Sequence, residues 1–101
     1  MSFLLTVTSP HEPFNSLMRD GSAGEKISSI LSDLNPEAVY FTEKNGTRSW
    51  TLVINVDDVA QIPSYAEPFF LTFNADCEFR IAMTPEDLGR AGLAELGEKW
   101  G

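Results

Sequence analysis

Residues 38–56 carry the feature that most constrains the fold, an Asn-Gly pair between two β-prone segments. Asn45-Gly46 favours a type I′ turn, because both central residues of that turn adopt a positive φ. A turn at this pair sets the register of a hairpin in which Phe41 lies opposite Trp50. One face of the hairpin is then large and apolar and the other mostly hydroxyl-bearing, so we expect helices to pack on the apolar face.

The same register places Glu43 opposite Arg48 near the tip of the hairpin. We expect these two side chains to form an ion pair that closes the apolar face. Because the pair would be exposed, its gain in stability is less than ~1 kcal/mol.

The rest of the chain alternates between strand and helix patterns. The predicted strands are 2–8, the two strands of the hairpin, and 77–83. Apolar residues at helical spacing predict a helical arm over 13–34 with a break near Gly21. The same spacing predicts a helix over 62–73, which Pro68 kinks or divides into two short turns.

Two segments have the residues of a helix start. Ser22 and Glu25 have capping-box spacing, in which each side chain binds the free backbone amide of the other residue. Thr84 precedes a proline and two carboxylates, so we expect it to cap a C-terminal helix. We expect Leu88 and Ala91 of that helix to face the core.

The element order is β-α-β-β-α-β-α, and we expect residues 1–101 to form a single α+β domain. This order fits a ferredoxin-like split βαβ fold, an antiparallel sheet with helices on one face. The residues expected to face the helices are Phe3, Leu5, Val7, Val39, Phe41, Trp50, Leu52, Ile54, Phe79 and Ile81. The opposite face is expected to carry Leu4, Thr6, Thr8, Tyr40, Thr42, Thr51, Val53, Asn55, Glu78 and Arg80.

Composition excludes several classes of partner. Fifteen acidic and seven basic side chains give a net charge of −8, which disfavours binding to nucleic acid or to an anionic membrane surface. No stretch approaches the ~20 apolar residues of a membrane span. The single cysteine, Cys77, excludes an internal disulfide, and we expect a cytoplasmic, reducing location.

A resemblance to a known family is carried by segments spread over nearly the whole chain. They are 20–31, 36–42 (Pro-Glu-Ala-Val-Tyr-Phe-Thr), 66–71, 73–75 and 83–88 (Met-Thr-Pro-Glu-Asp-Leu). These segments are similar to a small, uncharacterised bacterial family, whose members resemble the dimeric α+β barrel superfamily. That superfamily contains isomerases, small monooxygenases and regulatory ligand-binding domains, so the resemblance implies a dimeric α+β barrel and no single activity.

Some relatives in that family carry a pantothenate synthetase label, which the sequence does not support. Such ligases resemble nucleotidyl-transferring enzymes with a paired-histidine phosphate motif, whereas this chain has one histidine. The chain is also too short for their nucleotide-binding fold, and no Gly-rich phosphate loop follows a strand.

Five residues are candidates for a functional site. His11, between two prolines, is the candidate catalytic residue, with a surface or capping role as the alternative. Tyr40 and Arg80 lie on the predicted open face and are candidate ligand anchors, with pairing of Arg80 to a carboxylate across a dimer interface as the alternative. Trp50 and Phe70 are expected in the core or in the wall of an apolar pocket. We predict no metal site and no cofactor.

Two functions follow from these candidates. In the first, the protein binds or transforms a small anionic or aromatic metabolite in a cavity between sheet and helices or in a dimer lumen. In the second, it is a non-catalytic homodimeric structural or regulatory module, because no nucleophile–base pair, metal cluster or phosphate loop is evident.

A homodimer joined through the sheet is the predicted assembly. Helices on one side would leave the other face of the sheet uncovered, and that face mixes apolar residues with threonines. The C-terminal segment would then fold back over this sheet or pack around the partner, through its apolar residues Leu88, Leu93, Leu96 and Trp100.

Overall fold

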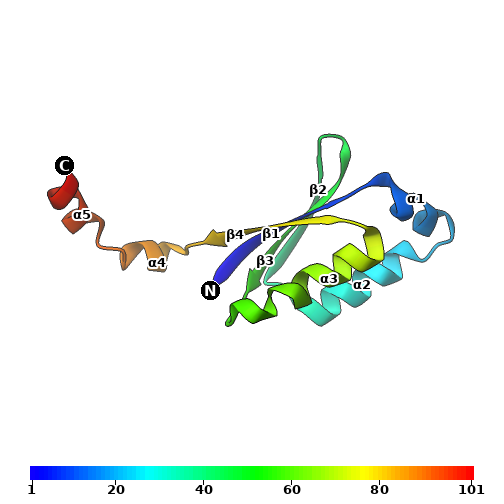
Figure 1. The fold of residues 1–101 in the computed structure, drawn as a ribbon, viewed down its shortest axis with the longest axis horizontal. Helices are drawn as coiled ribbons and strands as arrows, with labels where there is room; N and C mark the ends of the chain where they lie inside the picture. The colour runs from blue at the N-terminus through cyan, green and yellow to red at the C-terminus, as the bar shows by residue number, and fades with distance from the viewer.

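A four-stranded antiparallel sheet forms the centre of the protein (Figure 1). The computed structural model describes all 101 residues. The strands are β1 (Ser2–Ser9), β2 (Ala38–Lys44), β3 (Thr47–Asn55) and β4 (Asp76–Ala82). Their order in the sheet is β2-β3-β1-β4, with every neighbouring pair antiparallel, which confirms the predicted α+β fold and its split βαβ arrangement.

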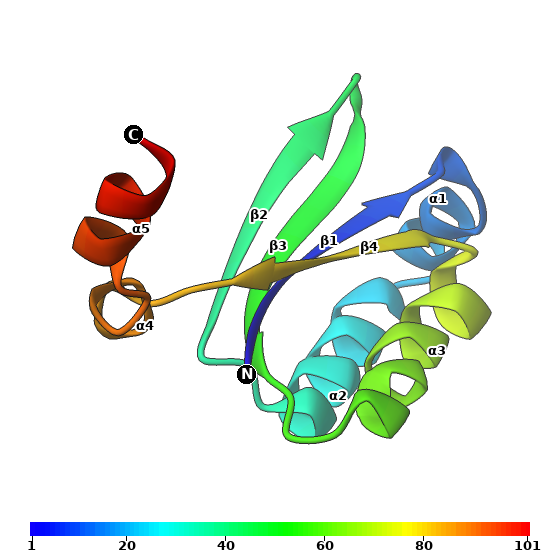
Figure 2. The same cartoon turned by 60° about the vertical axis from the view of Figure 1, so that its left-hand side comes forward.

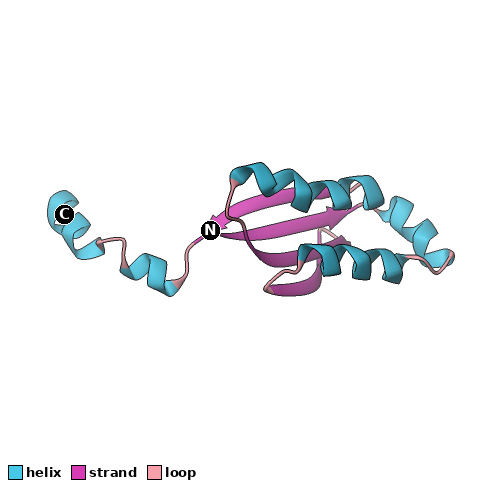
Figure 3. Ribbon diagram, turned by 90° about the horizontal axis from the view of Figure 1, so that it is seen from below, coloured by secondary structure: helices cyan, strands magenta, loops and turns pink.

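Helices cover one face of this sheet. They are α1 (His11–Arg19), α2 (Ala23–Leu34) and α3 (Ile62–Phe73), the last preceded by a 3-10 turn, η1 (Val59–Gln61). Two further helices, α4 (Pro85–Gly89) and α5 (Leu93–Trp100), follow β4. Figures 2 and 3 show α2 and α3 side by side against the sheet, and Figure 1 shows no helix packed on its other face. None of these helices combines the length and the apolar character needed to cross a membrane.

The β2–β3 hairpin has the predicted register. Asn45 and Gly46 form the turn with φ of 53° and 80°, and Phe41 lies opposite Trp50. The predicted ion pair between Glu43 and Arg48 is wrong. The Glu43 carboxylate instead accepts a hydrogen bond from the Gly46 amide at 2.9 Å, because the tight turn brings that amide within reach.

The helical arm breaks where predicted, but its second helix begins differently. Gly21 takes a φ of 82° and separates α1 from α2. The predicted capping box of Ser22 and Glu25 does not form, because Ser22 has helical dihedrals and its amide donates to Asp20 Oδ1 at 2.8 Å. In α3, Pro68 lies inside a continuous helix and does not divide it.

The core lies between the sheet and helices α1 to α3. The large apolar residues of the middle strands are buried there, together with aromatic residues of the helices; the cluster includes Phe3, Leu5, Val7, Phe14, Trp50, Leu52, Ile54, Phe69 and Phe73. Two residues predicted to face the helices, Phe41 and Ile81, are 58% and 71% exposed. They sit on the edge strands β2 and β4, where helix cover is incomplete, since Val39 and Phe79 on the same strands are only partly buried against the core.

The chain after β4 leaves the body of the molecule. Thr84 caps α4 as predicted, but Leu88 and Ala91 are exposed and do not face the core, which corrects that expectation. No residue after Ala75 is fully buried, and Cys77 and Phe79 of β4 are partly covered by the core. The radius of gyration is 17.1 Å, against about 13 Å for a compact domain of this length, because α4 and α5 extend beyond the end of the sheet (Figure 1).

Candidate functional site

An apolar pocket of about 240 Å³ opens between the first two helices and the hairpin. Its lining residues come from α1, α2, β2 and β3; they are Phe14, Met18, Ile27, Phe41, Thr42, Arg48, Ser49 and Trp50. Five of these eight are hydrophobic, and Arg48 is the one charged group among them. An apolar wall with a single charge is typical of sites for small organic ions.

Arg48 is held in an unusual position for a cation. Arg48 and Trp50 are two residues apart on β3, so both side chains lie on the helix-covered face of the sheet. The guanidinium carbon stacks over the Phe14 ring, 4.3 Å from the ring centroid. The Nη1 atom is buried and has no hydrogen-bond partner. A buried donor without a partner costs free energy, and an anion in the pocket would supply the partner.

The ring of Trp50 is fixed by the surrounding aromatic residues. Its centroid lies 5.9 Å from that of Phe14, 5.8 Å from Phe69, 5.5 Å from Phe73 and 6.2 Å from Phe41. The side chain is 4% exposed. The wall of the pocket is therefore rigid, because it is continuous with the core.

The open face of the sheet carries the other two ligand candidates, on opposite edges. Tyr40 on β2 is 68% exposed, and the Arg80 side chain on β4 is 71% exposed. Strands β3 and β1 separate them, which places the two edge strands about 14 Å apart at the usual strand spacing, and the two residues are further offset along the strands. Arg80 Nε donates to Glu78 Oε1 at 3.0 Å.

A polar groove of about 350 Å³ crosses the same open face. Its lining includes Thr6 and Thr8 of β1 and both members of an ion pair, Lys44 Nζ to Glu78 Oε2 at 3.6 Å. Lys44 is on β2 and Glu78 on β4, so the tip of the hairpin curls over the intervening strands. The open face is therefore concave.

His11 and Phe70 lie apart from the apolar pocket. His11 is exposed at the start of α1, and neither residue lines the pocket. The neighbouring Glu12 carboxylate accepts hydrogen bonds from the Ser16 hydroxyl and amide and lies 3.4 Å from Arg19, and these contacts hold the pKa of Glu12 below its usual value. Phe70 is 41% exposed on the outer side of α3.

Cys77 is a poor nucleophile. Burial, with the charges of Asp76 and Glu67 nearby, raises the pKa of its thiol to about 12. Almost no thiolate is then present near neutral pH. No group of three or more His, Cys, Asp and Glu side chains lies together in a way that could hold a metal ion.

Of the predicted site residues, Trp50 alone lines the apolar pocket, and Arg48 was not among those predicted. The predicted register already carried the relevant signal, because Arg48 shares a face of β3 with Trp50 and Leu52. A cation on the apolar face of a central strand needs a partner, and we assigned it Glu43. The stacking partner, Phe14, comes from a distant helix, which local pattern does not reveal.

Comparison with known proteins leaves the activity of this site open, since neither a family model nor a curated protein matches the chain.

Proposed function

We propose that the protein binds a small aromatic carboxylate in the apolar pocket, with Arg48 as the counter-ion. The observation that carries this proposal is the buried Nη1 atom of Arg48, which has no hydrogen-bond partner. A carboxylate would accept a charge-assisted hydrogen bond from this nitrogen, and such bonds are stronger than neutral ones.

The size of the pocket supports the same class of ligand. An engineered apolar cavity of about 150 Å³ takes up benzene. The 240 Å³ here therefore leaves room for one aromatic ring with a carboxylate group. Phe14, Met18 and Trp50 would contact the ring, while Arg48 would hold the charge.

Titration with benzoate tests the proposal. We expect shifts of the Trp50 indole and Arg48 Nε–H resonances in ¹H–¹⁵N spectra. Neutral benzamide should bind at least tenfold more weakly, because it lacks the charge. Arg48→Met should abolish the shift of the Trp50 resonance. Arg80→Met is the matched control, since Arg80 lies on the open face and outside the pocket.

Loss of binding in Arg80→Met but not in Arg48→Met would move the site to the open face, where we predicted Tyr40 and Arg80 as anchors. Because these two lie on opposite edge strands, such a ligand would span the sheet or sit between two copies of the chain. No shift with benzoate at millimolar concentration would contradict an aromatic carboxylate ligand. His11 stays a separate prediction for proton transfer.

A second candidate function is a homodimeric structural or regulatory module joined through the open face. The uncovered, concave sheet face favours it, since such a face has the shape of half a barrel that a second copy would close. The sheet order β2-β3-β1-β4 is also compatible with the dimeric α+β barrel superfamily. The unpaired Cys77 fits a reducing, cytoplasmic location.

A charge planted on the open face tests the dimer. Thr51 lies on the central strand β3, in one row with Tyr40 and Thr6. Thr51→Glu should reduce the mass measured by light scattering from that of two chains to that of one, because each copy would place a carboxylate against the other. A mass near 11.2 kDa for the unchanged protein at micromolar concentration would contradict the dimer.

A further inference from the structure

The chain after β4 presents an apolar surface that its own molecule does not cover. We call residues 83–101 the C-terminal arm. Its five large apolar side chains are all exposed, by 43% to 76%; they are Met83, Leu88, Leu93, Leu96 and Trp100. Single exposed apolar residues are ordinary, but a series of them on a projecting segment marks an interaction surface.

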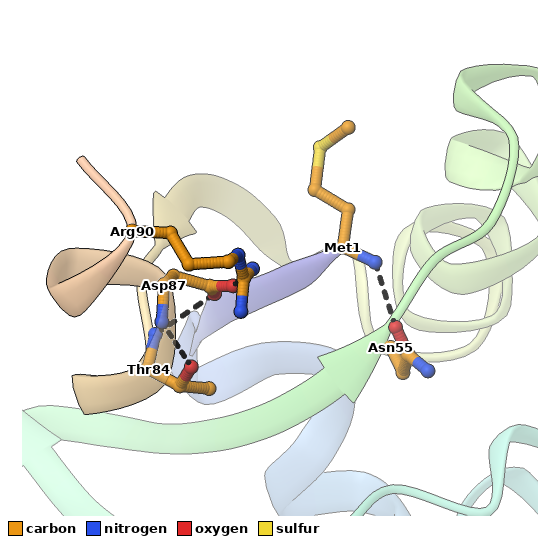
Figure 4. A network of polar contacts seen from close by, with 5 residues as sticks. All are labelled: Met1, Asn55, Thr84, Asp87 and Arg90. Carbon is orange, nitrogen blue, oxygen red and sulfur yellow. Dashed lines mark hydrogen bonds and ion pairs between the residues drawn. The ribbon is translucent and has the colours of Figure 1, made fainter. Parts of the chain in front are cut away.

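The base of the C-terminal arm is locally well defined. Thr84 accepts from the Asp87 amide at 3.1 Å, and the Asp87 carboxylate accepts from the Thr84 amide at 3.0 Å (Figure 4). Arg90 pairs with the same carboxylate. These contacts hold the pKa of Asp87 below its usual value. Helix α4 at the base of the arm is therefore held by its own side-chain contacts.

Helix α5 is amphipathic. Leu93, Leu96 and Trp100 are three and four residues apart, so they share one face of the helix. Glu95 and Glu98 lie off this face. Lys99 Nζ lies 5.2 Å from the Trp100 ring centroid. Trp100 is nevertheless 76% exposed. An isolated helix of eight residues is marginal in water, so α5 needs a surface to pack against.

The C-terminal arm projects away from its own core. Figure 1 shows α4 and α5 beyond the end of β4, past the end of the sheet. Only Met83 and Thr84 separate β4 from α4, and Thr84 is held extended with ψ of 165°. The capped start of α4 therefore follows almost directly on the end of β4.

We propose that the C-terminal arm packs on a second copy of this chain, with the Leu93, Leu96 and Trp100 face against the partner's open sheet face. This inference rests on the homodimer proposed above. That face offers Leu4, Val53 and Tyr40 among hydroxyl side chains, and both surfaces belong to every copy. In a dimer with two-fold symmetry, each arm would pack on the open sheet face of the other copy.

The area available suits a stable dimer. A tryptophan buries about 150–250 Å² when it is covered. Stable interfaces bury about 1,200–2,000 Å² in total, and the two Trp100 side chains of a dimer would contribute up to about 300–500 Å² of that area. A single arm folded on its own sheet would leave no such contact between copies.

Two variants of α5 test the arm. Leu96→Glu and Ala94→Glu introduce the same charge in the same helix, but Ala94 lies off the apolar face. We expect sedimentation to give a dimer for the unchanged protein and for Ala94→Glu. Leu96→Glu should raise the dimer dissociation constant at least tenfold. Both residues lie on the projecting arm and outside the core of the single chain, so both variants should keep the sheet and helices α1 to α3 folded, with the indole resonance of the buried Trp50 unchanged.

A mixed sample of ¹³C-labelled and unlabelled chains identifies the contact directly. We expect intermolecular nuclear Overhauser effects from the Trp100 ring to the methyl groups of Leu4 or Val53. If Leu96→Glu and Ala94→Glu are equally dimeric, the arm inference is overturned while the sheet dimer stands. If the unchanged protein is a monomer, both are overturned. Nuclear Overhauser effects from the Trp100 ring within one chain only would also overturn the proposal that each arm packs on the partner. Assemblies larger than a dimer would overturn it as well.

Discussion

At the scale of single residues, Arg48 lowers the stability of the ligand-free protein but offers a charge that a bound ligand can pair with. Its aliphatic stem and guanidinium plane pack on Phe14. The buried Nη1 atom, however, is shielded from water and has no hydrogen-bond partner in the protein. A buried donor of this kind costs about 1–3 kcal/mol, which the contact with the ring offsets only in part at about 0.5–1 kcal/mol. Such an arrangement is typical of a site that a ligand completes.

Arg48→Met separates these two effects. Methionine keeps much of the side-chain volume and removes the unpartnered charge, so the unfolding free energy without ligand should stay unchanged or rise by up to ~1 kcal/mol. Urea unfolding at one protein concentration measures it. Arg80→Met, at an exposed ion pair, should change the value by less than ~0.5 kcal/mol. A loss above ~1 kcal/mol in Arg48→Met would show that Nη1 has a partner in solution.

At the scale of elements, two similar capping patterns had opposite outcomes. Thr84 and Asp87 form a reciprocal box, whereas Ser22 and Glu25 do not. An N-cap residue needs extended dihedrals, and Thr84 has them because the following proline excludes the helical region. Ser22 has no proline after it, and the preceding turn leaves it with helical dihedrals. Residue spacing alone therefore did not predict the cap, whereas spacing with the proline did.

The hairpin turn offers a sharper test of an element. Gly46 has φ of 80°, where a β-branched residue is strained, so Gly46→Val should lower the unfolding free energy by more than ~1 kcal/mol. Gly24 lies in α2 with open space around its Cα, so Gly24→Ala should raise the same quantity by about 0.4–1 kcal/mol. Chemical denaturation of both variants gives the comparison. A neutral Gly46→Val would contradict the turn geometry and the register that depends on it.

At the scale of the whole molecule, the periodic spacing of apolar residues predicted the sheet and its covered face. It did not predict the position of the C-terminal arm. Alternation places Leu5, Val7 and Leu52 on one side whatever the tertiary detail, and all three are fully buried. The apolar spacing of 93–100 indicates an amphipathic helix in the same way, but it does not specify which surface covers that helix. Likewise, the apolar pocket could be anticipated from Trp50, whereas the contact of Arg48 with α1 depends on tertiary packing.

The response of the assembly to salt distinguishes the interfaces that this fold allows. Each chain carries a net charge of −8, so two copies repel each other over the whole molecule. Raising NaCl from about 0.1 to about 1 M shortens the screening length from about 10 to about 3 Å. An interface of apolar arm residues and open-face hydroxyls should therefore tighten, with a dimer dissociation constant that falls several-fold in analytical ultracentrifugation. An interface held by Arg80 against a carboxylate of the partner would respond in the opposite direction, because salt weakens exposed ion pairs. A dissociation constant that rises with salt would thus favour Arg80 as an interface residue and contradict an interface formed mainly by the apolar arm.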